Sequence, residues 1–534
     1  MADKWAAAIN GDEDEDEALR IAIARSLDQA PTKRPKKQAL LKDDGDAGRL
    51  ERVMDSGHTG QQVPSEIENA PSPLSSFSAL GLDRKKMEEE RLARLNKRKA
   101  SGPADVSTSR PAQRPKIATA PSSVLSDSVH GKERALEKSE PAVSAKETRD
   151  SSLSFPRGAV KKTWAFGQPR HGDDIRIEEV LQKHQLELAV LSSHQWDEEW
   201  LLSKIDLART KLILIAFATD KAQREEMQSN VPRERIRFCF PPMQAMGSMH
   251  SKLQLLKYGK YMRIVVPTGN LMPYDWGETG TMENMVFIID LPKFQSAEEQ
   301  NAQKLTPFGE ELSYFLLAQG LDEKLVGSLR NYDFSETSRY GFVHTIAGSH
   351  TADDAWRRTG YCGLGRMVRS LGIDSSGAIE LDYVCSSLGA VNDGLLRALY
   401  YACQGDSGLK EYDTRKAGRN TKNASSTKLD AIRDHLRVYF PSRGTVIRSK
   451  GGKDGAGTIC FQAKWWQAES FPHSVLRDCK SVRDGLVMHS KIIYVRFETR
   501  GGFVYVGSAN LSESAWKGNK IDDRKWDTKV IVPT

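Results

Sequence analysis

The sequence predicts an α/β protein with two similar lobes, and three observations lead to that prediction. From Phe155 onward, strand-like segments alternate with helical ones. One ordered set of polar residues occurs twice, about 240 positions apart. The 534 residues are enough for two or three domains, each with a core of its own. We therefore expect an N-terminal lobe over 154–340 and a C-terminal lobe over 341–534, each a central sheet sandwiched between helices.

The first 153 residues differ in composition from the rest of the chain. Trp5 and Phe77 are the only aromatic residues before Phe155, and Ser, Pro, Lys and Glu dominate. Such a segment cannot bury enough apolar surface to offset the entropy that it would lose on ordering. We therefore expect residues 1–153 to form a disordered tail.

One stretch of this tail, at about 12–29, has the pattern of a short amphipathic helix. Acidic residues fill 12–17, where a helix N-terminus favours negative charge. An acidic run followed by Leu-x-x-Ala, with Ser four residues after the Ala, resembles a ubiquitin-interacting motif; the alternative is an incidental amphipathic helix. The resemblance implies ubiquitin binding by Leu19, Ala22, Ile23 and Ser26.

Charge, cysteine content and hydropathy limit the cellular setting. A net charge of +7 permits a polyanionic partner without requiring one. The six cysteines lack metal-binding spacing, so we expect free thiols, a reducing compartment, and no metal or other cofactor. Because the sequence has neither a signal peptide nor an apolar run of about 20 residues, we expect no association with membranes. We also expect a monomer. Basic clusters at 33–37, 97–99 and 114–116 favour import into the nucleus.

The elements of the N-terminal lobe are predicted from local patterns. Residues 211–217 form a continuous apolar run, which is typical of a fully buried strand. We expect further strands at 235–240, 249–257 and 261–266, and helices at 175–186, 310–318 and 323–331.

The C-terminal lobe repeats this mixture of strands and helices. We expect strands at 341–346, 380–385, 457–463, 487–495, 503–506 and 528–532. Helices at 395–404 and 427–438 fill the gaps between them.

The repeated set has the order His, Lys, Asn, Trp. His250-Ser251-Lys252-Leu253 corresponds to His489-Ser490-Lys491-Ile492, and each segment is followed about twenty residues later by an asparagine. A tryptophan lies six residues after each asparagine. Such a repeat predicts two half-sites on two similar lobes. The later members of the two copies are Asn270 with Trp276 and Asn510 with Trp516.

Strand geometry would bring these side chains together. Side chains at i and i+2 point to the same face of a strand, so His250 and Lys252 should project into one cleft, as should His489 and Lys491. The next strand of each lobe ends at its asparagine. We therefore expect each histidine, lysine and asparagine at the same end of two neighbouring strands.

A doubled set of this kind suits transfer of a phosphoryl group from a diester. Two ammonium groups and two carboxamides can hold the non-bridging oxygens and neutralise the charge of the transition state. One imidazole can attack phosphorus, while the other protonates the leaving oxygen and later activates water. His-x-Lys alone is weak evidence, because the tail contains another copy at 130–132. A structural repeat without chemistry is the alternative.

The doubled His-x-Lys, with Gly507-Ser508-Ala509-Asn510 after the second copy, resembles the phospholipase D superfamily. Most of its members have Asp five residues after each Lys, where this chain has Lys257 and Arg496. The branch without those aspartates is the tyrosyl-DNA phosphodiesterase family, whose fungal members this chain resembles from about Ser154 onward. The supporting motifs are Gly269-Asn270-Leu271, Asp275-Trp276, Ser386-Ser387-Leu388-Gly389, Val438-Tyr439-Phe440-Pro441 and Gly507-Ser508-Ala509-Asn510-Leu511-Ser512.

The resemblance implies two phospholipase D-like lobes around one shared cleft, and hydrolysis of the bond between a DNA 3′-phosphate and a topoisomerase I tyrosine without a metal. It implies that His250 is the nucleophile, which forms a phosphohistidine, and that His489 is the acid and then the base. The phosphate would be bound by Lys252, Lys491, Asn270 and Asn510. The carboxylates nearest to supporting positions are Glu283 and Asp527, and the DNA backbone would be contacted by Ser386, Ser387, Ser508 and Ser512.

Two alternatives stay open on the sequence alone. One is a broader 3′-end-processing phosphodiesterase or nuclease. The other is a ubiquitin- and DNA-binding adaptor with impaired catalysis, because the chain ends at Thr534, soon after Asp527, and its C-terminal lobe should be shorter than in the relatives.

Overall fold

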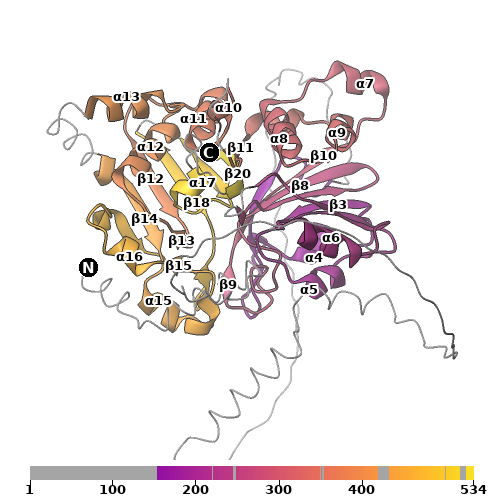
Figure 1. The fold of residues 1–534 in the computed structure, drawn as a ribbon, viewed down its shortest axis with the longest axis horizontal. Helices are drawn as coiled ribbons and strands as arrows, with labels where there is room; N and C mark the ends of the chain where they lie inside the picture. Colours follow the sequence, from indigo (N-terminus) through magenta and orange to yellow (C-terminus); the bar gives the residue numbers. More distant parts are fainter. Residues whose placement is uncertain are drawn as a thin grey trace, which may run out of the picture. The chain divides into compact units, whose positions relative to one another are not determined.

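The computed structural model describes residues 153–534, except 219, 244–247, 349, 351–353, 419–431, 499–500 and 517–524. The tail, with its ubiquitin-interacting-like segment and basic clusters, lies outside the described residues. The described chain forms two large mixed sheets, one in each lobe, which confirms the predicted α/β class. Helices lie on both faces of the first sheet, with α8 and α9 on one side and α4, α5 and α6 on the other (Figure 1).

The first-lobe sheet has the strand order β2-β1-β10-β8-β7-β3-β4-β5. The pairs from β1 through β10, β8 and β7 to β3 are antiparallel, and β3, β4 and β5 are parallel to one another. Every residue of β8 is buried, as a central strand requires. The strands are β1 Ala159–Thr163, β2 Asp174–Ile175, β3 Leu188–Ser192, β4 Lys211–Ile215, β5 Ile236–Cys239, β7 Leu253–Lys257, β8 Tyr261–Pro267 and β10 Met285–Pro292.

The second-lobe sheet has the order β11-β20-β19-β18-β12-β14-β16. Its first five strands are antiparallel neighbours, and β12, β14 and β16 are parallel. Short strand pairs complete the fold: β13 Ser387–Leu388 with β15 Cys460–Phe461, and β9 Met282–Glu283 with β17 Val487–Met488. The large strands are β11 Gly341–Thr345, β12 Ile379–Val384, β14 Leu436–Phe440, β16 Leu476–Asp478, β18 Ile492–Phe497, β19 Gly502–Gly507 and β20 Lys525–Pro533.

Polar caps begin several of the helices. Thr306 accepts a hydrogen bond from the Gly309 amide at the start of α8, and Asn392 accepts one from the Leu395 amide at the start of α12. The helices are α4 Ile177–Leu181, α5 Glu198–Ser203, α6 Lys221–Ser229, α7 Ala297–Ala302, α8 Pro307–Ala318, α9 Glu323–Gly327, α10 Ala355–Arg358, α11 Gly360–Ser370, α12 Asp393–Cys403, α13 Leu409–Gly418, α15 Arg443–Arg448, α16 Ala463–Trp466 and α17 Glu513–Trp516. The 3₁₀ turns are η2 Ser328–Asn331, η3 Ser335–Arg339, η4 Lys453–Ala456 and η5 His473–Val475.

Three predicted elements outside the His-x-Lys segments were wrong. The helix expected at 175–186 is only α4, because Asp174–Ile175 pairs with β1. The strand expected at 457–463 shrinks to Cys460–Phe461, which is followed at once by α16. The end of the helix expected at 427–438 is strand β14, in which Leu436, Val438 and Phe440 alternate inward between two parallel neighbours. The rest of that predicted helix lies mostly outside the described residues.

The hydrophobic core of the first lobe extends into the second lobe. Phe287, Phe308 and Phe315 lie in the first-lobe core, which also contains Phe342 and Val530 from the second-lobe sheet. Strand β19 contacts both β8 and β10. The lobes therefore share an apolar interface that fixes one against the other.

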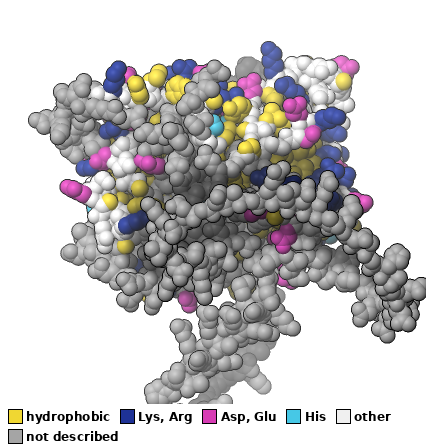
Figure 2. Space-filling model, in the orientation of Figure 1, with side chains coloured by type: hydrophobic (Ala, Val, Ile, Leu, Met, Phe, Trp, Pro, Cys, Tyr) yellow, Lys and Arg dark blue, Asp and Glu magenta, His cyan; other side chains and the backbone are white. Residues whose placement is uncertain are grey.

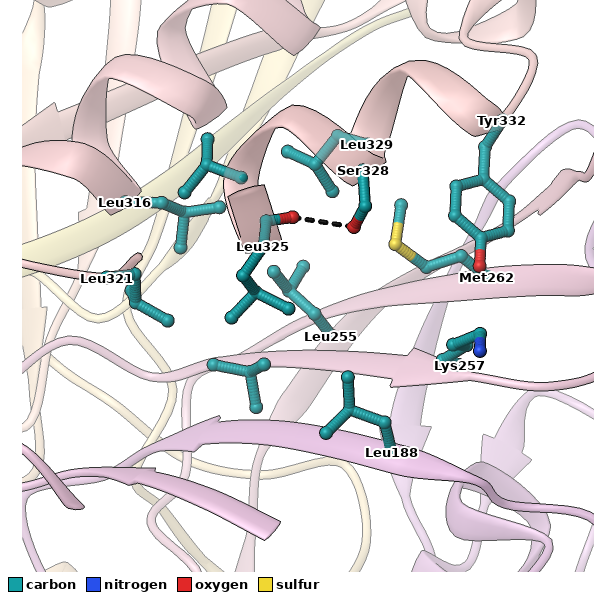
Figure 3. A pocket seen from close by; sticks show the side chains of 12 residues that line it. Leu188, Leu255, Lys257, Met262, Leu316, Leu321, Leu325, Ser328, Leu329 and Tyr332 are labelled. Carbon is teal, nitrogen blue, oxygen red and sulfur yellow. Dashed lines mark hydrogen bonds between the residues drawn. The ribbon is translucent and has the colours of Figure 1, made fainter. Parts of the chain in front are cut away.

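A small cavity of about 40 Å³ lies between strands β3, β7 and β8 and the α8–α9 region (Figure 3). Its polar atoms come from Lys257, Ser328 and Tyr332, and the Ser328 hydroxyl donates to the Leu325 carbonyl at 2.6 Å. This volume is close to the space that one water molecule occupies in liquid water, which is about 30 Å³. This cavity is a gap in packing and offers no convergent set of reactive groups.

The described surface is mixed in charge. Basic and acidic side chains are interspersed on the face drawn in Figure 2. Among the residues that the structure describes, no helix has the length and apolar character needed to cross a membrane.

Candidate active site

Each His-x-Lys segment lies where the chain leaves one lobe and enters the sheet of the other. Strand β6, Ser248–Met249, pairs with β20 of the second lobe before the chain joins the first-lobe sheet as β7. Strand β17 pairs with β9 of the first lobe before the chain joins the second-lobe sheet as β18. A strand cannot change partners without interrupting its ladder, so 250–252 and 489–491 are irregular. The continuous strands predicted at 249–257 and 487–495 were wrong at these three-residue breaks.

The first histidine is held by a carboxylate from the second lobe. The Nδ1 atom of His250 lies 2.8 Å from Oδ1 of Asp527, and the Ser508 hydroxyl donates to the same oxygen at 2.7 Å. The His250 side chain is 11% exposed, whereas Asp527 is fully buried. A carboxylate acceptor at Nδ1 favours the tautomer with its proton there, which leaves the Nε2 lone pair available for reaction.

The second histidine is held by a carboxylate from the first lobe. Its Nδ1 atom lies 2.6 Å from Oδ1 of Asp275, whose other oxygen accepts from the Asn270 amide at 2.9 Å. Burial lowers the pKa of His489, Asp275 opposes this shift, and Lys491 and Lys252 act in the same direction as burial, so that the pKa is about 4. Although burial acts in the other direction, His489 and Lys491 hold the pKa of Asp275 below its ordinary value. In this environment His489 is neutral near pH 7 unless an anion binds.

The two lysines form an unusual pair of buried cations. The ammonium of Lys252 donates to the His250 carbonyl at 3.1 Å, and that of Lys491 donates to the carbonyls of Thr268, at 3.3 Å, and His489. Burial, and then the charge of Lys252, hold the pKa of Lys491 well below its ordinary value. Like charges that face each other away from water are costly unless an anion lies between them. The site is therefore built to receive a negatively charged group.

The two asparagines are oriented by other side chains and by backbone amides. The Oδ1 atom of Asn510 accepts from the amides of Ser386, at 3.3 Å, and Ser387, at 3.1 Å, so its nitrogen is the atom left to donate to an anion. The Nδ2 atom of Asn270 donates to Gln195 at 3.3 Å. Among the described residues, the buried Oδ1 of Asn270 has no hydrogen-bond partner.

The serines expected at the DNA backbone differ in accessibility. Ser508 is fully buried and its hydroxyl donates to Asp527. Ser386 is also fully buried, and its hydroxyl donates to Asn510 at 3.3 Å. Ser387 is partly exposed, as is Ser512, whose hydroxyl lies 3.1 Å from that of Ser514. Ser387 and Ser512 are therefore the more accessible of the four serines.

Glu283 does not support a histidine with its side chain. Its carboxylate accepts from Nε of Arg483 at 2.6 Å, and only its backbone carbonyl meets the second histidine, accepting from the His489 amide at 3.0 Å. The carboxylate partner of His489 is instead Asp275. The sequence contained a signal for Asp275: it lies five residues after Asn270, where the second copy has Ala515, and so it is an acidic difference between two similar motifs.

Within the described residues, no three His, Cys, Asp or Glu side chains are grouped as metal ligands, and none of the six cysteines is part of a disulfide. The groups that meet in this site are two imidazoles on carboxylates, two ammonium groups and two carboxamides. Together they can supply a nucleophile, an acid or base on the opposite side, and stabilisation for a phosphate.

Comparisons with known proteins agree with this chemistry. The family model of tyrosyl-DNA phosphodiesterase matches residues 159–533. The fold is similar to that of yeast tyrosyl-DNA phosphodiesterase, with a TM-score of 0.52, 16% identity and coverage of 70% of this chain and 90% of that chain. A variant of the yeast protein with one histidine replaced by asparagine matches with a TM-score of 0.52, 17% identity and the same coverage. At these identities, the likeness to the solved structures establishes the fold alone.

Proposed function

This chain belongs to the tyrosyl-DNA phosphodiesterase family, and we propose that it hydrolyses the bond between a DNA 3′-phosphate and the tyrosine of a topoisomerase I-derived peptide through a covalent phosphohistidine. The observation that carries this proposal is the pair of histidines, each fixed at Nδ1 by a carboxylate from the opposite lobe, beside two buried lysines.

In the first step, Nε2 of His250 attacks phosphorus, and the bond from phosphorus to the tyrosine oxygen breaks. Protonated His489 gives its proton to that oxygen, so the peptide leaves as a neutral tyrosine. Lys252, Lys491 and the two asparagines hold the non-bridging oxygens as charge develops on them.

In the second step, neutral His489 takes a proton from water while the water oxygen attacks phosphorus. The bond from phosphorus to His250 breaks, and the product is a DNA 3′-phosphate. His489 is protonated again as long as the product phosphate stays bound.

The phosphate itself supplies the condition for acid catalysis. Burial lowers the pKa of His489 to about 4 in the unliganded chain, with Lys491 and Lys252 acting in the same direction. A bound phosphodiester anion offsets the two ammonium charges and raises the proton affinity of the imidazole. The acid therefore becomes charged only when a substrate is present.

Single-turnover cleavage of a 3′-phosphotyrosyl oligonucleotide tests this proposal. We expect loss of cleavage in His250→Ala, and a DNA adduct that accumulates in His489→Asn because its hydrolysis lacks a base. Cleavage should persist in the presence of a chelator. Unchanged cleavage by His250→Ala would refute the assignment of the nucleophile.

Substrate range is a separate question, because the reacting groups act on phosphorus and on the leaving oxygen, which other 3′ adducts share. Comparison of phosphotyrosyl, phosphoglycolate and plain diester ends separates a specific enzyme from a broader 3′-end-processing phosphodiesterase or nuclease. An adaptor with impaired catalysis would bind these ends without turnover.

We also propose that the tail binds ubiquitin and directs the protein to the nucleus, and that the chain is a fungal-type member of its family. The support for ubiquitin is the spacing of Leu19, Ala22, Ile23 and Ser26 behind an acidic run, and the support for the nucleus is the three basic clusters. Titration of the labelled full chain with ubiquitin, with Ala22→Arg as the control variant, tests the first. Imaging of a chain with the clusters at 33–37, 97–99 and 114–116 neutralised tests the second.

A further inference from the structure

The last strands of the two lobe motifs are equivalent residue by residue. In the first lobe, Val286 pairs with Pro267, and in the second lobe Lys529 pairs with Gly507. Counting back along these ladders makes Asn284 the counterpart of Asp527. Both residues precede the strand that returns beside the asparagine motif.

The surrounding hydrogen bonds repeat in the same way. Thr268 donates to Oδ1 of Asn284 at 2.8 Å, just as Ser508 donates to Oδ1 of Asp527 at 2.7 Å. Each of these hydroxyls also accepts a backbone amide, from Met285 at 3.0 Å and from Thr528 at 2.9 Å. The two positions therefore occupy the same place in two copies of one local structure.

The carboxylate that contacts the histidine nevertheless occupies a different position in each lobe. In the second lobe it is Asp527, and the position five residues after Asn510 is Ala515. In the first lobe the carboxylate is Asp275, five residues after Asn270, and an amide, Asn284, stands where Asp527 would be. Each arrangement delivers one carboxylate oxygen to the Nδ1 atom of the histidine from the other lobe.

The orientation of the Asn284 amide follows from its neighbours. Because the Thr268 hydroxyl accepts from the Met285 amide, its single hydrogen goes to Oδ1 of Asn284. The Asn284 nitrogen therefore faces Asp275 and donates to its Oδ1 at 2.8 Å and to its backbone carbonyl at 3.0 Å. That Oδ1 is the oxygen bonded to His489.

The backbone makes room for this contact at one residue. A Cβ atom on Gly269 would lie 2.8 Å from both Cγ and Nδ2 of Asn284 and 3.1 Å from Cβ of Asp275. In the second lobe the same position holds Ala509, where the counterpart of Asp275 is an alanine. Gly269 thus leaves space for the Asn284–Asp275 pair.

We propose that Asn284 is a positioning residue for His489: it holds the Asp275 carboxylate on Nδ1, and position 284 is a second place from which a carboxylate can serve the same histidine. This proposal rests on the proposed function, in which His489 is the acid and then the base. It assigns to Asn284 no contact with the substrate.

The first test separates leaving-group protonation from the rest of the reaction. Asn284→Ala should slow cleavage of the phosphotyrosyl substrate roughly tenfold to a hundredfold, the worth of a hydrogen bond to a charged group. With a nitrophenyl ester as the leaving group, which needs no proton, the first step should be nearly unaffected, and the phosphohistidine should accumulate because its hydrolysis still needs His489. An equal slowing of the first step with both substrates would overturn the positioning role.

The second test moves the carboxylate. Asp275→Ala should lower the rate by about a hundredfold or more, and Asp275→Ala/Asn284→Asp should recover at least tenfold of this loss. The matched double variant Asp275→Ala/Asn284→Ala should recover nothing. If the two double variants are equally slow while circular dichroism shows both folded, position 284 cannot hold the carboxylate and the proposal fails.

Two further variants, Gly269→Ala and Asn284→Asp, test the role of Asn284. Gly269→Ala should reproduce the Asn284→Ala phenotype by displacing the amide, whereas Gly455→Ala, where a Cβ meets nothing within 4 Å, should behave as wild type. The pH–rate profile of Asn284→Asp should shift toward higher pH, because a second carboxylate joins Asp275, Lys491 and Lys252 around His489. An unshifted profile would count against the proposal. If the wild-type chain cleaves no 3′ end at all, the proposed function itself is refuted.

Discussion

His250 and Asp527 are joined by a 2.8 Å hydrogen bond although 277 positions separate them in the chain. The reciprocal bond joins His489 to Asp275. Each of these two pairs takes its histidine from one lobe and its carboxylate from the other, so the pairs form only where the lobes meet.

Replacement of Asp527 by Asn should keep the shape of the site and lose most of its activity. The amide cannot favour the Nδ1-protonated tautomer of His250 as a carboxylate does, and the rate should fall by about a hundredfold to ten-thousandfold. The measurement is single-turnover formation of the phosphohistidine. Asp173→Asn, which removes an exposed carboxylate paired with Lys162, is the control and should be without effect.

Acid should destabilise the chain through His489. Burial lowers its pKa to about 4 in the folded chain, from an ordinary value of 6.5. The unfolded chain therefore binds the additional proton between these values. This contribution to stability is complete above about pH 6.5 and is lost as the pH falls toward 4, by up to about 3 kcal/mol. Urea unfolding at pH 7 and pH 4.5 should show a smaller loss for His489→Asn than for wild type, and equal losses would contradict the assignment.

Replacement of Lys491 by Met should abolish cleavage without destabilising the fold. Burial and the charge of Lys252 already disfavour the charged form of this side chain, so a hydrocarbon of similar length costs little or stabilises. Inorganic phosphate should raise the melting temperature of wild type by roughly a few degrees, and this response should vanish in the variant. Lys257→Met, at a half-exposed lysine paired with Glu187, should retain both activity and the response.

Arg483 should stabilise the junction of the lobes. Its guanidinium donates to Glu283 at 2.6 Å and to the Thr163 carbonyl at 2.9 Å, next to the β9–β17 pair that leads into His489. Arg483→Met leaves a buried carboxylate alone and should cost about 3 kcal/mol or more. Arg483→Met/Glu283→Gln should recover part of this loss in chemical denaturation. Additive losses in the double variant would show that the pair does not interact.

The sequence predicted the two-lobe α/β fold because the duplicated His, Lys, Asn and Trp residues mark both copies. Apolar runs such as 211–217 and 261–266 also predicted strands, since their patterns are local. Strands do form at 211–215 and 261–267, although the first is only partly buried and not fully buried as expected. The same local reasoning failed at 250–252 and 489–491. There the chain exchanges a partner in one lobe for a partner in the other, and no periodicity within the segment encodes that exchange.

The carboxylate of His489 illustrates a second limit. The family resemblance pointed to Glu283, whereas the ladder register makes Asn284 the counterpart of Asp527, and the carboxylate that contacts His489 is Asp275. The correct residue could be identified only from the first residue of the strand that pairs with the one before the asparagine, which is β10 or β20. The position of that first residue depends on the pairing between the strands. Sequence spacing alone cannot fix a register to one residue.

The unequal placement of the two carboxylates has a consequence for the architecture of the enzyme. In a homodimer of single-lobe chains, every substitution occurs in both copies. Both halves would therefore have the supporting carboxylate at the same sequence position. Asp275 with Ala515, and Asn284 with Asp527, break that constraint. Covalent linkage of the halves permits the two imidazoles to have different surroundings, as the proposed division of roles requires.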